Sequence, residues 1–191
     1  MSETIRIAMW SGPRNLSTAM MRSFGARNDT LCIDEPFYAA YLALTGLDHP
    51  MRAEILHAHP TDPDAIARTL ADDPVGVPIF YQKHMTHHMV DGVPRGWMAR
   101  VRNVFLIRHP ARVLVSYARK MDEVSLEAIG FSQQFELFER EAQRVGRAPV
   151  VVDGDDVLKD PAFAIAAMCK AIGISYDPAM LSWTPGRKPE D

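Results

Sequence analysis

The residues best suited to chemistry lie in two short segments that combine basic and hydroxyl side chains. The first segment, Ser11 to Thr18, follows the apolar run Ile5 to Trp10 and leads into a helical pattern. A helix start exposes unpaired backbone N–H groups and the positive end of the helix dipole. Ser17 and Thr18 add hydroxyl donors, and Arg14 adds a planar, permanently charged fork. The segment therefore predicts a cradle for a terminal phosphate or sulfate group.

This cradle differs from the common nucleoside triphosphate loop. That loop, GxxxxGK[ST], places a Gly-Lys pair before the hydroxyl residue, whereas Asn15-Leu16 precede Ser17 here. The simpler alternative is a helix capped by Asn15 or Ser17, with Arg14 on the surface.

The second segment runs from Ile107 to Tyr117, roughly ninety residues further along the chain. Arg108 follows an apolar strand, and Ser116 lies about two turns into the next helix. An Arg and a Ser placed in this way can bind one further phosphate. The alternative is an ordinary ion pair of Arg108 at a strand end.

Both segments resemble the nucleotide-binding motifs of sulfotransferases. The resemblance implies that 3′-phosphoadenosine 5′-phosphosulfate is the donor and 3′,5′-adenosine bisphosphate the product, with no metal. It implies that the 5′-phosphosulfate is held by Gly12, Arg14, Asn15, Leu16, Ser17 and Thr18. It assigns the 3′-phosphate to Arg108 and Ser116. The family usually has Lys where Arg14 stands, and His109 replaces the commoner Asp or Asn.

Sulfuryl transfer needs a cation near the leaving phosphate and a base for the acceptor proton. Arg14 and Lys83 are the candidates for the cationic role. Glu35, in the run Asp34-Glu35-Pro36-Phe37-Tyr38, and His84 are equally supported candidates for the base. Each resembles the base of one branch of the family.

Apolar strand-like runs alternate with helical patterns along the chain. The strands are expected at 5–10, 30–33, 77–82, 101–107 and 149–152. The helices are expected at 16–27, 37–44, 63–70, 111–120, on a stripe from Phe135 to Val145, and at 161–172. This predicts an α/β fold of the three-layer P-loop type, with a central, mostly parallel sheet of about five strands flanked by helices.

A single sulfotransferase-like domain is expected over residues 1–191. Arg187 and Lys188 resemble the start of the family's late basic loop, but no Trp follows them, so the closing segment is expected to be lacking. The net charge of −3 favours neither nucleic acid nor a membrane surface as a partner. A cytoplasmic location is the default, and homo-oligomerisation stays open.

Metal binding is disfavoured. His84, His87 and His88 lack the spacing of a known metal motif, and Asp153 to Asp156 are better explained as a helix cap. The expected function is sulfuryl transfer to a hydroxyl or amine of a small molecule. The alternatives are an ATP-dependent small-molecule kinase and a non-catalytic nucleotide-binding relative.

Overall fold

A computed structural model describes residues 3–118 and 129–186 of the chain. The predicted helix end at Lys120 and the basic residues Arg187 and Lys188 lie outside these ranges.

Five strands form one sheet in which every neighbouring pair is parallel. The strand order is β2-β3-β1-β4-β5, so β1 is central. The strands are β1 (Ile5–Ser11), β2 (Thr30–Asp34), β3 (Ile79–Met85), β4 (Arg102–Ile107) and β5 (Val150–Asp153). The predicted sheet of about five strands is confirmed, and it is parallel throughout.

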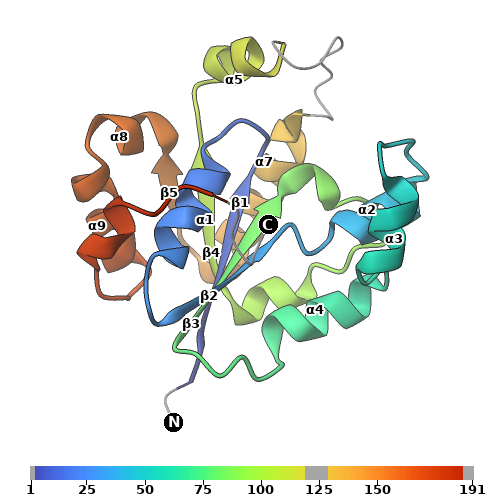
Figure 1. The fold of residues 1–191 in the computed structure, drawn as a ribbon, viewed down its shortest axis with the longest axis horizontal. Coiled ribbons are helices and arrows are strands. Elements are labelled where there is room, and N and C mark those ends of the chain that lie inside the picture. Colours follow the sequence, from blue (N-terminus) through green and yellow to red (C-terminus); the bar gives the residue numbers. More distant parts are fainter. Residues whose placement is uncertain (1–2, 119–128, 187–191) are drawn as a thin grey trace.

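Helices cover both faces of this sheet, which gives the predicted three layers (Figure 1). One face carries α1 (Ser17–Gly25), α8 (Gly154–Lys159) and α9 (Pro161–Ala171). The other carries α2 (Tyr38–Thr45), α4 (Pro63–Ala71) and α7 (Phe131–Val145). A short helix, α3 (Arg52–Ala58), lies outside α2, and α5 (Pro110–Tyr117) follows β4 beyond the carboxyl edge of the sheet. Three single 3₁₀ segments span Thr86–His88, Gly96–Arg100 and Pro178–Leu181.

Most element boundaries agree with the sequence to within three residues, and the difference that matters for the site is at the end of β3. The strand continues to Met85, so Lys83 and His84 lie inside it and not after it. Both side chains are buried, at 4% and 2% exposure. Polar residues can occupy a buried strand when each has a partner, and both do: Lys83 meets two carboxylates and His84 meets an aromatic cluster.

The stripe predicted on the long helix is also wrong. Phe135 is 65% exposed, and the buried residues of α7 are Gln134, Leu137 and Glu141. The spacing of apolar residues predicts the wrong buried face here, because two polar side chains on the buried face have partners within the protein. Gln134 bonds to the backbone, and Glu141 pairs with Arg144.

His84 lies within the aromatic part of the core. Its ring stacks on Trp10 at 4.4 Å between centroids, and it lies 5.3 Å from Trp97 and 5.9 Å from Phe37. Its Nε2 is 3.3 Å from Oε1 of Gln82. Burial lowers the pKa of His84 to about 3. The ring is therefore neutral in the folded protein at any ordinary pH.

This depressed pKa predicts a specific loss of stability in acid. The unfolded chain protonates His84 near pH 6.5, whereas the folded chain does not until about pH 3. The unfolded state thus binds more protons in this window, and stability falls as pH falls through it. His84 alone should contribute about 2 kcal/mol of lost unfolding free energy by pH 5.

Urea unfolding at pH 7 and pH 5 measures the effect. His84→Phe keeps a ring in the stack and should shrink the pH-dependent loss, whereas His57→Phe, at an exposed position of α3, should leave it as in the wild type. Equal losses in all three proteins would show that His84 is not the cause.

Candidate functional site

The loop between β1 and α1 has the backbone expected of an anion cradle. Arg14 and Leu16 both adopt left-handed conformations, with φ of 65° and 64°. Such values are uncommon for non-glycine residues and carry strain, which concentrates at functional sites. Leu16 occupies the cap position of α1, and no side chain caps the helix there. The first N–H groups of α1 thus lack the side-chain acceptor that a capped helix would have.

Asn15 is the most unusual residue of this loop. It is fully buried, and neither its amide nitrogen nor its amide oxygen has a hydrogen-bond partner. A buried unsatisfied amide is costly, and in a native structure it points to a missing ligand or water. The loop therefore fits a polar ligand that would satisfy this amide.

Gln134 anchors the loop to the rest of the fold. The Gly12 N–H donates to Oε1 of Gln134 at 3.2 Å, and Nε2 of Gln134 donates to the Leu106 carbonyl at 2.9 Å. A Cβ atom at Gly12 would lie 2.4 Å from the carbonyl oxygen of Ile129, so glycine is required by close backbone approach. Sequence reasoning missed Gln134. Its only signal was an amide on the helix face that also carries Leu137.

The two predicted anion-binding segments meet in space. Nε of Arg14 donates to Oγ of Ser116 at 2.9 Å, and Nη1 of Arg108 donates to the carbonyl of Arg14 at 3.1 Å. A hollow of about 390 Å³ is lined by Arg108, Ser116 and three further residues of α5: Ala111, Arg112 and Val115. Residues nearly a hundred positions apart thus form one basic site.

The carboxylate of Asp155 partly neutralises the positive charge of this site. Its Oδ1 lies 3.0 Å from Nη1 of Arg112 and 3.6 Å from Nε of Arg108. Asp155 therefore lies near two of the three guanidinium groups of this site, those of Arg108 and Arg112, and no contact between it and Arg14 is among those of the described residues. The neighbouring Asp153 caps α8 by accepting from the Asp155 N–H at 2.8 Å, as predicted.

A second group of charges lies where β2 and β3 end. Nζ of Lys83 lies 2.6 Å from Oδ1 of Asp34 and 2.8 Å from Oε1 of Glu35. Burial is the largest influence on the pKa of Lys83 and lowers it, but the two carboxylates together outweigh burial, and the pKa is raised. Lys83 is therefore a permanent ammonium that holds Glu35 in place.

Glu35 itself is strained. Its φ is 43°, a left-handed value, and Pro36 follows it. A residue before proline normally prefers an extended backbone. Two backbone hydrogen bonds hold the turn: the Glu35 N–H donates to the Lys83 carbonyl at 3.0 Å, and the Tyr38 N–H donates to the Glu35 carbonyl at 2.9 Å. Strain maintained by surrounding contacts is typical of functional positions.

His88 lies beside Glu35. Nε2 of His88 is 3.9 Å from Oε2 of Glu35, and the ring stacks on Tyr38 and Tyr41 at 5.1 and 4.9 Å. Burial, reinforced by neighbouring His87, His84 and Lys83, lowers the pKa of His88 well below its ordinary value. His88 is therefore a neutral neighbour of Glu35, not an ionic partner. Within residues 3–118 and 129–186, no three His, Cys, Asp or Glu side chains are grouped as a metal site would require.

The predicted site residues thus divide into two groups and one outlier. Arg14, Arg108 and Ser116 meet at the ends of β1 and β4, and Lys83 joins Glu35 at the ends of β2 and β3. His84 belongs to the aromatic core. Among the described helices, none is both long enough and apolar enough to cross a bilayer.

A parallel sheet with a strained basic loop after its central first strand defines an α/β domain of the P-loop type. Residues 5–191 match the family model described as the sulfotransferase domain. The chain belongs to this sulfotransferase domain family.

Two curated relatives come from Arabidopsis thaliana. They are named branched-chain-amino-acid aminotransferase-like proteins 1 and 2, and they are 32% and 31% identical over 100% and 97% of this chain. The matched region is 34% and 33% of those proteins, so the chain spans about a third of their length.

Solved structures of sulfotransferases share the fold. The sulfotransferase from Alicyclobacillus acidocaldarius has a TM-score of 0.59 at 12% identity, covering 99% of this chain and 88% of that one. The sulfotransferase domain of the Synechococcus PCC 7002 olefin synthase has a TM-score of 0.58 at 14% identity, covering 95% and 78%. Mouse sulfotransferase SULT7A1, complexed with PAP, has a TM-score of 0.51 at 11% identity, covering 94% and 63%.

Removing the Lys83 ammonium should destabilise the fold. Lys83→Met leaves Asp34 and Glu35 facing each other without their shared cation, and their partial exposure of 28% and 29% limits the penalty. We expect a loss of about 2–4 kcal/mol in unfolding free energy. Arg100→Met breaks an exposed pair with Asp72 and should change stability by less than about 1 kcal/mol. Urea unfolding compares the two, and equal losses would contradict a structural role for Lys83.

Proposed function

We propose that this domain transfers a sulfuryl group from 3′-phosphoadenosine 5′-phosphosulfate to a small-molecule acceptor. The observation that carries the proposal is the convergence of Arg14, Arg108 and Ser116 into one basic site. A nucleotide with phosphates at both its 5′ and 3′ positions needs two anion-binding groups close together, and this chain supplies them from two distant segments.

The loop residues would hold the 5′ end of the donor. Arg14 would bind it through its guanidinium fork, Ser17 and Thr18 through their hydroxyls, and Gly12 and Leu16 by shaping the backbone. The unsatisfied amide of Asn15 would gain a partner. Arg108 and Ser116 would hold the 3′-phosphate at the hollow beside α5.

The donor supplies an activated sulfuryl group whose bond to a phosphate oxygen breaks as the acceptor attacks. Negative charge then develops on that phosphate oxygen, and a preorganised cation beside it lowers the barrier. We assign this role to Arg14. Lys83 would not bind the leaving phosphate, because its ammonium donates to Asp34 and Glu35. Its role would be to position the carboxylate of Glu35.

Glu35 is the better candidate for the general base. Its carboxylate is partly exposed, fixed by Lys83 and located at the carboxyl edge of the sheet. His84 is 2% exposed and enclosed by Trp10, Trp97 and Phe37, so an acceptor could not reach it without opening the core. We therefore assign proton removal to Glu35.

Thermal unfolding with different nucleotides tests the donor site. 3′,5′-Adenosine bisphosphate should raise the unfolding midpoint well above the shift given by ATP with magnesium, because only the former presents a 3′-phosphate. Arg108→Ala should remove this preference, and Arg140→Ala, at an exposed position of α7, should keep it. A larger shift with ATP and magnesium would instead favour a kinase.

Glu35→Gln tests the base. The amide keeps the size of the side chain but cannot take a proton, so kcat should fall by about 10²–10⁴-fold. The affinity for 3′,5′-adenosine bisphosphate should stay within about twofold, since Glu35 lies apart from the phosphate loop. Unchanged turnover in this variant would assign the proton to another group.

A further inference from the structure

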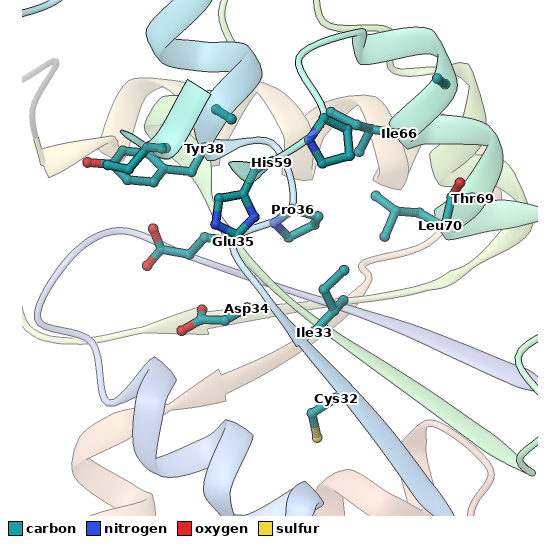
Figure 2. Close-up of a pocket in the computed structure, with 14 residues that line it drawn as sticks. Cys32, Ile33, Asp34, Glu35, Pro36, Tyr38, His59, Ile66, Thr69 and Leu70 are labelled. Atoms are coloured by element: carbon teal, nitrogen blue, oxygen red, sulfur yellow. The ribbon is translucent and has the colours of Figure 1, made fainter. Parts of the chain in front are cut away.

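Two cavities lie beside the two edge strands of the sheet, and their walls differ in chemistry. The cavity beside β2 measures about 640 Å³, and its lining combines the carboxylates of Asp34 and Glu35 with His59 and apolar side chains (Figure 2). It adjoins the proposed base and belongs to the site described above. The cavity beside β5 measures about 390 Å³ and is lined by apolar side chains, apart from Arg108 and Gln134.

This apolar groove beside β5 is open to solvent. Phe131, Phe135 and Phe138 of α7 form one wall, and Phe135 is exposed. Ile107 of β4 and Val151 of β5 form part of the rest, and both are exposed as well. Single exposed apolar residues are common, but several that line one groove mark an interaction surface. The groove is therefore suited to contact with another polypeptide.

The strand beside the groove has an unpaired outer side. β4 is the neighbour of β5 in the sheet, and no backbone hydrogen bond joins Val150, Val151 or Val152 to any other described segment. Free edges are commonly protected by a charged residue or a proline within the strand, and these three valines include neither. An otherwise parallel sheet can accept an antiparallel strand at its edge. The outer side of β5 can therefore pair with a further strand.

The charges at the two ends of β5 are opposite in sign. Arg147 precedes the strand, and Asp155 and Asp156 follow it. If two copies of β5 pair in antiparallel fashion about Val151, residue 147 of each copy lies opposite residue 155 of the other. Each basic end then meets an acidic end, whereas parallel pairing sets like charges side by side. Within the described part of the chain, neither Arg147 nor Asp156 forms an ion pair.

We propose that two copies of this chain associate edge to edge through β5, antiparallel and about a twofold axis perpendicular to the sheet. The two five-stranded sheets then become one continuous sheet, with both α7 helices on the same face. Phe135 of each copy packs at the groove of the other, so the exposed apolar side chains cover one another. Such an interface uses the same patch twice and closes, as in most homodimers. It does not depend on the proposed function.

Sedimentation velocity over about a hundredfold range of protein concentration tests the association. We expect a monomer–dimer equilibrium that shifts to the dimer as concentration rises. Phe135→Lys places a charge in the groove and should lower the association constant at least about tenfold. Met51→Lys makes the same change at the start of α3, away from the groove, and should leave the constant unchanged. The two positions are matched in exposure, at 65% and 67%.

Exchange of charges tests the orientation. Arg147→Glu and Asp156→Arg each set like charges against one another twice in a symmetric dimer, so each should lower the association constant at least about tenfold. The double variant Arg147→Glu/Asp156→Arg restores opposite charges and should return the constant to within about threefold of the wild type. Asp155 is left unchanged because it pairs with Arg108 and Arg112.

A cysteine at the centre of β5 tests the register. Directly opposed residues of an antiparallel pair have Cβ atoms about 4.5–5.5 Å apart, close to the range that a disulfide needs. Val151→Cys should therefore form a cross-linked dimer on mild oxidation. Leu31→Cys, in the opposite edge strand β2 and matched in exposure at 46% against 44%, should not. The wild type, with Cys32 and Cys169, gives the background.

The outcomes are decisive for the interface and separate from the proposed function. A protein that stays monomeric at every concentration overturns the proposal. A dimer that Phe135→Lys leaves intact, or that the double charge exchange fails to restore, overturns its location or orientation. Equal cross-linking through positions 31 and 151 overturns the register. Stabilisation by 3′,5′-adenosine bisphosphate tests the proposed function independently of all these results.

Discussion

The parallel pairing of β1 with β3 on one side and β4 on the other is the constraint from which the site follows. Because all five strands run in the same direction, the segments that leave β1, β2, β3 and β4 emerge at one edge of the sheet. The pairing brings the loop after β1 next to α5, so that Arg14 reaches Ser116. It also sets Asp34 opposite Lys83 in the β2–β3 register. The strand pairing is therefore enough to bring together the residues of the basic site and the residues around Lys83.

The buried ammonium of Lys83 then divides the edge into two chemically different halves. On the side of β1 and β4, guanidinium groups outnumber carboxylates, and an anion is favoured. On the side of β2 and β3, the ammonium of Lys83 is already paired with the carboxylates of Asp34 and Glu35. The two ends of this edge therefore differ: one gathers guanidinium groups, and the other holds an ammonium paired with carboxylates. The net charge of the whole chain, −3, conceals this separation.

Much of the fold and part of the site could be predicted from sequence, for identifiable reasons. Continuous apolar strands and capped helices are local patterns, so the parallel sheet and the cap at Asp153 were found correctly. The end of β3 was missed because Lys83 and His84 look like loop residues until the carboxylates and rings that surround them are known. Gln134 and His88 were missed for the same reason. Their importance lies in partners from distant segments, and one sequence does not show which segments meet.

The ion pairs of Asp155 affect how strongly the basic site could bind an anion. Oδ1 of Asp155 lies near both Arg108 and Arg112, so it is a counter-ion for the two guanidinium groups. Under the proposed function, a donor phosphate would have to compete with this carboxylate, so the net gain on binding would be smaller than for unpaired arginines. The same competition would favour release of the product, because Asp155 would pair with Arg108 again.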